Sequence, residues 1–181
     1  MSVSNPTFEA LVERHSAEIH AYLWRLLRDA DLASDGLQDT FLRAWRAFPK
    51  LKHHDHLRAW LYTIATHRAQ SLLRVRSRSE ARHTDLTDEM ADPRVSVGKQ
   101  VVDRETWRRV LAAVDRLPAK QRQALILRRY QELSYGEIAA VMGGTAGAAR
   151  ANVHLAQERL RSWLQGDDAE GPPVERRRGE A

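Results

Sequence analysis

The chain has 181 residues, a length that fits one domain or two small ones. Hydrophobic residues make up 43% and charged residues 29%, so the sequence can form a core and is not that of a wholly disordered chain. The absence of cysteine excludes disulfides, thiolate nucleophiles and thiolate zinc sites, and the net charge of +5 permits a polyanionic partner without establishing one.

Nothing in the sequence suggests a membrane protein or a secreted one. No apolar run approaches the roughly 20 residues that a membrane-spanning helix needs. Residues 1–7 lack the basic and then apolar layout of a signal peptide. We therefore expect a cytoplasmic protein that does not insert into a membrane.

The first predicted helix begins at Phe8, because apolar residues recur at helical spacing from there to Leu26. Asn5 and Pro6 suit its cap and first turn. The helix is therefore expected to bury one apolar face.

A second helix is predicted for residues 32–48, where Pro49 marks its end, and a third for residues 57–75. The second helix is expected to bury Leu37, Phe41, Ala44, Trp45 and Phe48. Strand signals such as two-residue alternation are absent, so this part of the chain should be a helical bundle.

Residues 77–104 are polar and mixed in charge, without an apolar stripe, which is typical of a flexible connection. Helical spacing resumes at Trp107, and Leu117 and Pro118 begin another helix that reaches Tyr130. The fold class is thus all-α, with two small helical domains. We place the first domain at 1–76, a flexible linker at 77–104, the second domain at 105–165 and a disordered tail at 166–181.

A short helix, a glycine turn and a longer helix follow in the second domain. Ser134 and Glu137 form a capping box that starts a helix at Tyr135, and Gly143 and Gly144 end it. Thr145 can cap the next helix, whose buried stripe is predicted to be Ala149, Val153, Ala156, Leu160 and Trp163.

This arrangement is a helix-turn-helix, whose second helix can present side chains to base edges in a major groove. The exposed candidates are Arg150, Asn152, His154 and Leu155. The alternative is a helix hairpin that only packs.

Two faces in the first domain are also candidates. One face of the second helix carries Asp35, Gln38, Asp39, Leu42, Arg43 and Arg46, and an apolar residue among hydrogen-bonding groups suits docking of a partner helix. The third helix carries Thr63, Thr66, His67, Gln70 and Arg74 behind Trp60 and Tyr62, a mixture that suits single-stranded nucleic acid. Either face could instead simply meet water.

No metal, cofactor or catalytic motif is predicted. His53, His54, Asp55 and His56 are adjacent on a short loop and rarely converge in tetrahedral geometry. The glycine-rich residues 143–147 follow a helix and lack the lysine of a phosphate loop. We expect a protein that is not an enzyme and needs no cofactor.

Both blocks resemble one family. Residues 34–45 (SDGLQDTFLRAW), Phe48 and residues 58–65 (RAWLYTIA) resemble region two of the extracytoplasmic-function sigma factors. Region four of the same group is resembled by Leu117, Pro118, Arg122, residues 133–135, residues 137–139, Gly147 and Leu160. The motifs occur in the family's order and spacing.

The resemblance implies a sigma factor that binds core RNA polymerase and directs promoter recognition, DNA melting and transcription initiation. Asp35, Gln38, Asp39, Leu42, Arg43 and Arg46 would dock on the β′ coiled coil. The minus-ten element would meet Lys50, Lys52, His53, Trp60, Tyr62, Thr63, Thr66, His67, Gln70 and Arg74. The minus-35 element would meet Tyr135, Thr145, Arg150, Ala151, Asn152, His154 and Leu155, while this domain also touches the β flap.

The resemblance further implies an anti-sigma factor, often membrane-bound, so the protein would occupy the nucleoid or be held at the membrane. Family members commonly have Asn and Asp where this chain has His67 and Ser71, and arginines where it has Asn152, Leu155 and Gln157. We therefore expect a different promoter preference and weak duplex binding by the free protein. The alternative function is a stand-alone helix-turn-helix regulator.

Overall fold

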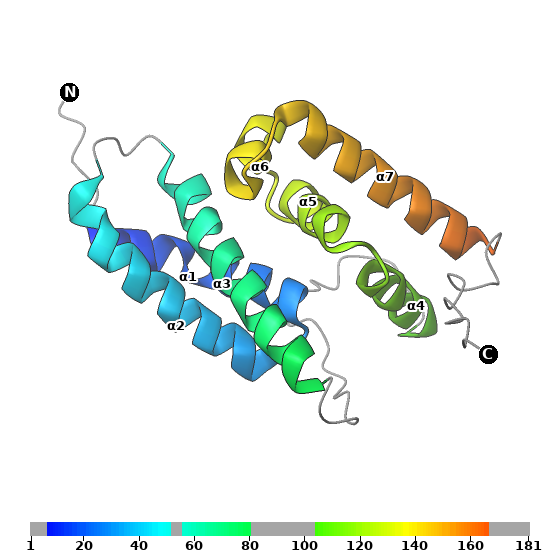
Figure 1. Cartoon of the computed structure of the whole chain (residues 1–181), viewed down its shortest axis with the longest axis horizontal. Helices are drawn as coiled ribbons and strands as arrows, with labels where there is room; N and C mark the ends of the chain where they lie inside the picture. Colours follow the sequence, from blue (N-terminus) through cyan, green and yellow to red (C-terminus); the bar gives the residue numbers. More distant parts are fainter. Residues whose placement is uncertain (1–6, 52–55, 81–103, 167–181) are drawn as a thin grey trace, which may run out of the picture.

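The structure, a computed structural model, describes residues 7–51, 56–80 and 104–166. Every regular element in these ranges is a helix, which confirms the all-α prediction (Figure 1). Helices α1 to α3 form a front half, and helices α4 to α7 form a rear half.

In the front half, α1 (Phe8–Leu27), α2 (Ala30–Ala47) and α3 (Leu57–Glu80) all pack against one another. The cap of α1 is Thr7, whose hydroxyl accepts from the backbone N–H of Ala10 at 3.3 Å. The prediction that Asn5 caps this helix is therefore wrong by two residues, because Thr7 is the side chain that reaches the first turn.

Helix α2 ends at Ala47, and the 3-10 helix η1 (Phe48–Lys50) follows with Pro49 inside it. Phe8 packs edge-on against Phe41 and Phe48, with ring centroids 6.4 and 5.5 Å apart. Trp45 does not join this cluster: it is 59% exposed, so its predicted burial is wrong. Ala44 occupies the inward row of α2, and one further residue turns Trp45 about 100° away from it.

The rear half consists of α4 (Arg104–Asp115), α5 (Ala119–Arg129), α6 (Tyr135–Met142) and α7 (Ala146–Gln165). The capping box at Ser134 and Glu137 is confirmed, and so is the turn, where Gly143 takes a φ of 67°. Such a left-handed conformation favours glycine because it has no Cβ. Thr145 caps α7, as predicted.

Helix α3 continues through residue 80, beyond the predicted end of the third helix at residue 75, and α4 begins at Arg104, so both helices reach into the residues assigned to the predicted linker. Residues 76–80 are arginine, serine and glutamate, which sustain a helix without an apolar stripe. The remainder of that linker, residues 81–103, and the tail from 167 lie outside the described residues.

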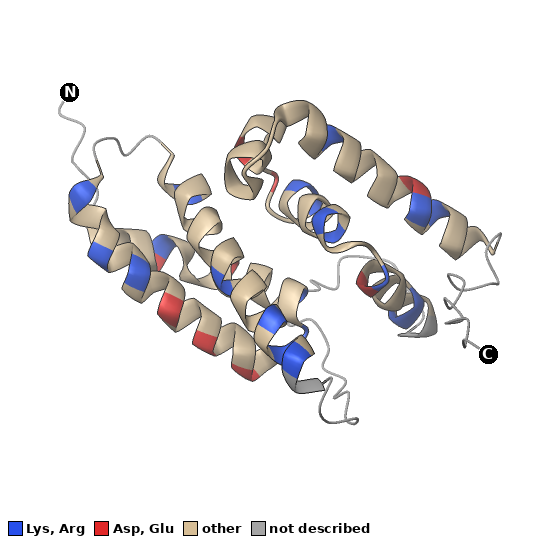
Figure 2. Ribbon diagram, viewed as in Figure 1, with Lys and Arg blue, Asp and Glu red and all other residues tan. Residues whose placement is uncertain are grey.

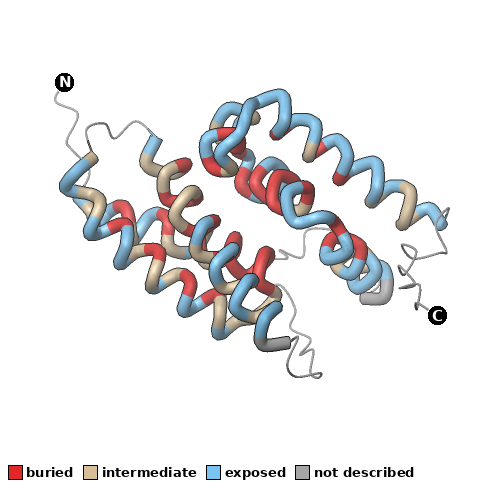
Figure 3. Tube along the Cα trace, in the orientation of Figure 1, coloured by how far each residue is buried: buried red, intermediate tan, exposed pale blue. Residues whose placement is uncertain are grey.

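The two halves pack together, with α6 against α3 and α5 against α1. One cluster of buried apolar side chains runs through both halves, from Ile19 and Leu61 to Ile138 and Val153. Figure 3 shows the buried positions turned toward the helix contacts and the exposed ones on the outside of α2 and α7. Two amphipathic units have thus buried a shared interface.

Candidate functional site

The outer face of α2 is the first part of the site. Asp35, Gln38, Leu42, Arg43 and Arg46 are exposed as predicted, and Leu42 keeps 53% of its surface in solvent. Trp45 extends this face, since Asp35, Gln38, Leu42 and Trp45 follow one another at three-, four- and three-residue steps. Residues at this spacing form a row along which one helix packs on another, and we call this row the docking seam. The same spacing in the sequence would have placed Trp45 on this exposed face.

Charge changes sign along α2 (Figure 2). Along α2 the acidic residues come before the basic ones, in the order Asp31, Asp35, Asp39, Arg43 and Arg46. A partner helix on this face would therefore meet opposite charges at its two ends around an apolar centre.

Asp39 differs from the rest of this predicted set because it is half-buried and faces α3. Arg43 Nε donates to Asp39 Oδ2 at 2.9 Å, and Arg68 Nε lies 3.0 Å from the same oxygen. One carboxylate oxygen therefore serves two guanidinium groups from different helices.

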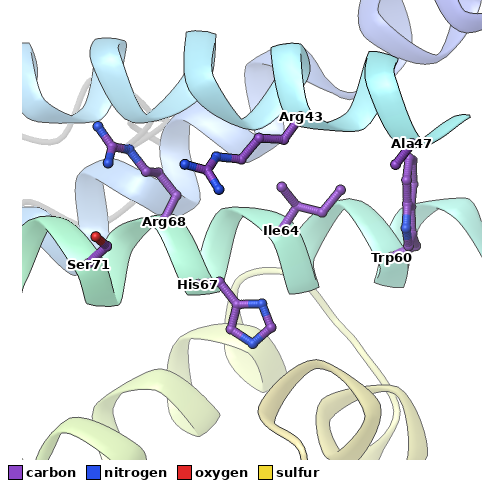
Figure 4. A pocket seen from close by; sticks show the side chains of 7 residues that line it. All are labelled: Arg43, Ala47, Trp60, Ile64, His67, Arg68 and Ser71. Atoms are coloured by element: carbon purple, nitrogen blue, oxygen red, sulfur yellow. The ribbon is translucent and has the colours of Figure 1, made fainter.

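A pocket of about 330 Å³ opens between α2 and α3 beside this ion cluster (Figure 4). Its lining is Arg43, Ala47, Trp60, Ile64, His67, Arg68 and Ser71. Figure 4 shows Trp60 standing beside Ala47 at one end and both arginines reaching in from opposite helices at the other. An aromatic ring, an apolar wall and several donors in one hollow suit a planar polar ligand.

The pocket unites residues from two separate predictions. Trp60 and His67 belong to the predicted minus-ten set, whereas Arg43 was placed in the polymerase set. Arg68 and Ile64 are absent from both predictions. They occupy the next positions on the pocket side of α3 after Trp60, so helical spacing from Trp60 would have found them.

The predicted minus-ten face of α3 is only partly available. His67, Gln70 and Arg74 are exposed, while Thr63 is half-buried and bonds the carbonyl of Ala59 at 3.0 Å. Tyr62 is 0% and Thr66 is 1% exposed, so in this arrangement neither can touch DNA. The expectation that they lie on an open face is corrected by the rear half, which covers them.

A buried polar network fills the interface at this point. Tyr62 Oη donates to Oε1 of Gln131 at 2.7 Å, and Nε2 of Gln123 donates to Oγ1 of Thr66 at 3.3 Å. Tyr22 Oη lies 2.6 Å from the same Thr66 oxygen. Burial raises the pKa of both tyrosines well above the ordinary value, so they remain neutral hydrogen-bonding groups.

An ion pair continues the interface toward α1. Arg58 donates to both carboxylate oxygens of Glu18 and to the carbonyl oxygen of Gln131, at 2.8 to 3.2 Å. Burial would raise the pKa of Glu18, but hydrogen bonds from Arg58 and His15 together hold this pKa below its ordinary value. Arg58 therefore joins α1, α3 and the turn before α6.

The helix-turn-helix presents a second candidate surface. Along α7, Arg150, His154 and Leu155 are exposed as predicted, and Ala151 is exposed as well. Asn152 is half-buried, so the expectation that it is exposed is wrong. The Arg150 guanidinium lies 5.2 Å from the centre of the half-buried Tyr135 ring.

Two of the predicted minus-35 residues use their side chains for hydrogen bonds to the backbone of α7. Nδ2 of Asn152 donates to the carbonyl oxygen of Ala148 at 2.9 Å, and Oγ1 of Thr145 accepts from the Ala148 N–H at 3.1 Å. His154 pairs with Glu158 at 3.3 Å.

The remaining predicted minus-ten residues are Lys50, Lys52 and His53, which precede α3. Lys50 is exposed at the end of η1, whereas Lys52 and His53 lie outside the described residues. Within the described ranges, side chains of His, Asp and Glu form no cluster suited to a metal ion. Of the helices described, none is long and apolar enough to cross a bilayer.

Comparison with known proteins places these features in one family. Residues 11–79 match the model of sigma-70 region 2, and residues 107–160 match the model of sigma-70 region 4. The chain is 33% identical over 160 residues to the RNA polymerase sigma factor CarQ of Myxococcus xanthus, covering 87% of this chain and 88% of CarQ.

A relative named as an extracytoplasmic-function (ECF) sigma factor and a solved structure agree. EcfG of Rhodopseudomonas palustris is 33% identical over 152 residues, covering 84% of this chain and 82% of EcfG. The sigma factor RpoE of Bartonella quintana, solved in complex with the anti-sigma factor NepR, superposes with a TM-score of 0.73 at 27% identity. That superposition covers 88% of this chain and 98% of RpoE. The chain therefore belongs to the ECF group of the sigma-70 family of RNA polymerase sigma factors.

Proposed function

We propose that the outer face of α2 docks on a helical element of core RNA polymerase, as the family resemblance implies for the β′ coiled coil. The observation that carries this proposal is the seam of Asp35, Gln38, Leu42 and Trp45, in which two large apolar side chains stay exposed. Exposed apolar groups within a polar rim are typical of an interface core. Arg43 and Arg46 complete that rim.

The pocket between α2 and α3 receives an unstacked base of the non-template strand. Trp60 offers a stacking surface, and base stacking on an aromatic side chain is worth about 1–3 kcal/mol. Arg43, Arg68 and His67 supply donors to base edges or phosphate. This gain offsets the few kcal/mol that extruding a base costs.

The helix-turn-helix reads the upstream minus-35 element as duplex. Arg150, Ala151, His154 and Leu155 form the exposed row of α7 that would meet base edges. Because this row offers one arginine, affinity depends on the polymerase contact as well as on DNA. The β flap is the proposed second contact of this half.

Binding of promoter DNA by all of α3 requires the halves to separate, because Gln123 and Gln131 cover Thr66 and Tyr62. The packed arrangement is thus proposed to be an inactive resting state. An anti-sigma factor is a proposed partner of this state, since RpoE superposes along nearly its whole length in a complex with NepR. Location at the nucleoid, or at a membrane through such a partner, follows from the same proposal.

The test is transcription in vitro with purified core polymerase and a template carrying the promoter region of the protein's own gene. Specific transcripts that need both components support the proposal. The alternative, a stand-alone regulator, binds its operator as a dimer without polymerase. Footprints on duplex DNA from the free protein, with no transcript in the mixture, would favour it. The chain itself is proposed to make and break no bond.

A further inference from the structure

Asp39 stands between the two sites of the front half. It belongs to the α2 helix that carries the polymerase-docking seam, yet its Oδ2 atom contacts Arg43 at 2.9 Å and Arg68 at 3.0 Å. Both arginines line the pocket. A single carboxylate therefore balances part of the charge that the pocket offers to nucleic acid.

The two contacts are not equivalent. Arg43 Nε makes a hydrogen bond, whereas Arg68 Nε is buried and, within the described part of the chain, has an ion-pair contact without hydrogen-bond geometry. A buried N–H without a hydrogen-bond partner is costly. Arg68 is therefore held by charge attraction and would gain by turning to a better acceptor, such as a phosphate or base oxygen.

The guanidinium groups also repel each other. They approach from opposite helices (Figure 4), and Asp39 lies against both of them. With two arginines and one aspartate, the cluster carries one net positive charge. Removing the aspartate from the cluster leaves two.

We propose that Asp39 is a positioning residue that couples the docking seam to the pocket, an inference that rests on the proposed function. While Asp39 holds Arg43 and Arg68, the pocket is partly neutralised and binds single-stranded DNA weakly. When a basic group of the polymerase helix engages the Asp39 carboxylate, both guanidinium groups turn to the DNA strand. Linkage makes the effect reciprocal, so DNA in the pocket also strengthens polymerase docking.

The experiment uses the full chain with Asp39→Asn, which keeps the shape of the side chain and an acceptor oxygen for Arg43. A fluorescein-labelled single-stranded DNA of random sequence, twelve nucleotides long, is titrated at several salt concentrations. Binding is expected to tighten about three- to tenfold at low salt, and the salt slope to steepen by about 0.7, the value of one more cation on a single strand. Affinity for core polymerase is expected to fall in the same variant.

Two further variants separate this mechanism from general charge effects. Glu13→Gln makes the same change in net charge at an exposed position of α1 outside both proposed surfaces, and it should leave both affinities near those of the wild type. In an Arg68→Met background, the Asp39→Asn change should lose most of its effect on DNA binding. Thermal unfolding of each variant checks that the fold is retained.

Each outcome decides. Unchanged DNA affinity and salt slope in Asp39→Asn overturn the proposal, and so does an equal response to Glu13→Gln. Tighter DNA binding with unaltered polymerase affinity overturns the coupling. Binding of the wild-type chain to polymerase tests the proposed function separately. If the wild type does not bind polymerase, the proposed function is wrong, whatever the DNA titration gives.

Discussion

The hydrogen bond between Tyr62 and Gln131 joins α3 to the turn before α6. Its removal therefore tests whether the two halves are held together by the buried polar network. Tyr62→Phe removes only the hydroxyl that donates to Gln131 Oε1 at 2.7 Å. Gln131 is 4% exposed, so its oxygen would remain buried without that donor. Such a loss costs about 1–3 kcal/mol, which corresponds to a population of separated halves roughly 5- to 150-fold larger.

Separation of the halves can be measured by energy transfer between two dyes. The chain has no cysteine, so Arg46→Cys on α2 and Gln157→Cys on α7 provide two unique, exposed attachment points. The wild type should give mainly one high-transfer population. Tyr62→Phe should add a low-transfer population and should increase binding of single-stranded DNA, because α3 becomes accessible.

Thr40→Val is the matched control. The buried hydroxyl of Thr40 donates to the carbonyl oxygen of Gly36 at 2.6 Å within α2, so its loss should change the stability of the front half without a comparable change in energy transfer. If Tyr62→Phe leaves the transfer distribution and the urea unfolding midpoint as in the wild type, the polar network does not hold the halves together.

Three other predictions concern separate parts of the chain. Leu42→Ala and Trp45→Ala should each weaken polymerase binding by about 1–3 kcal/mol in a titration, while their exposure keeps the unfolding free energy within roughly 0.5 kcal/mol; intact binding would remove both side chains from the interface. Glu18→Gln should destabilise the fold near neutral pH, and because the folded pKa of Glu18 is lowered, the difference from wild type should shrink as pH falls below the ordinary pKa of 4.5 and vanish below the folded pKa; urea unfolding that gives a difference independent of pH would contradict this. Ser134→Ala should lower the free energy of unfolding by about 1 kcal/mol, because it removes the capping box with Glu137. Thermal unfolding measures this loss, and the control Ser77→Ala, at an exposed position, should show a smaller one.

Local signals in the sequence predicted local structure well. The capping box at Ser134, the turn at Gly143 and the cap at Thr145 depend on residues within a few positions of one another. The exposed row of α2 follows equally from helical spacing. These features, together with the family motifs, were enough for the helical elements and for the two candidate surfaces.

The errors arise where a distant segment decides the outcome. Helical spacing alone cannot tell that Gln123 and Gln131 cover Thr66 and Tyr62, because these contacts join residues far apart in the chain. Trp45 is expected in the core because it falls in the apolar stripe with Phe41 and Phe48, yet among the described residues it remains exposed on the outer side of α2. Asp39 was grouped with its exposed neighbours, whereas Arg68 on another helix draws it inward.

Assembly with core RNA polymerase is the most direct test of whether the outer face of α2 docks on that enzyme. Labelled protein titrated with purified core enzyme should form a stable one-to-one complex, detected by fluorescence anisotropy and by co-elution in gel filtration. The double variant Asp35→Ala with Gln38→Ala should lose most of that affinity while unfolding at the wild-type temperature. A wild-type chain that stays free at micromolar core enzyme would show that the protein does not dock on it, and a double variant that binds as tightly as the wild type would show that this face of α2 is not the docking surface.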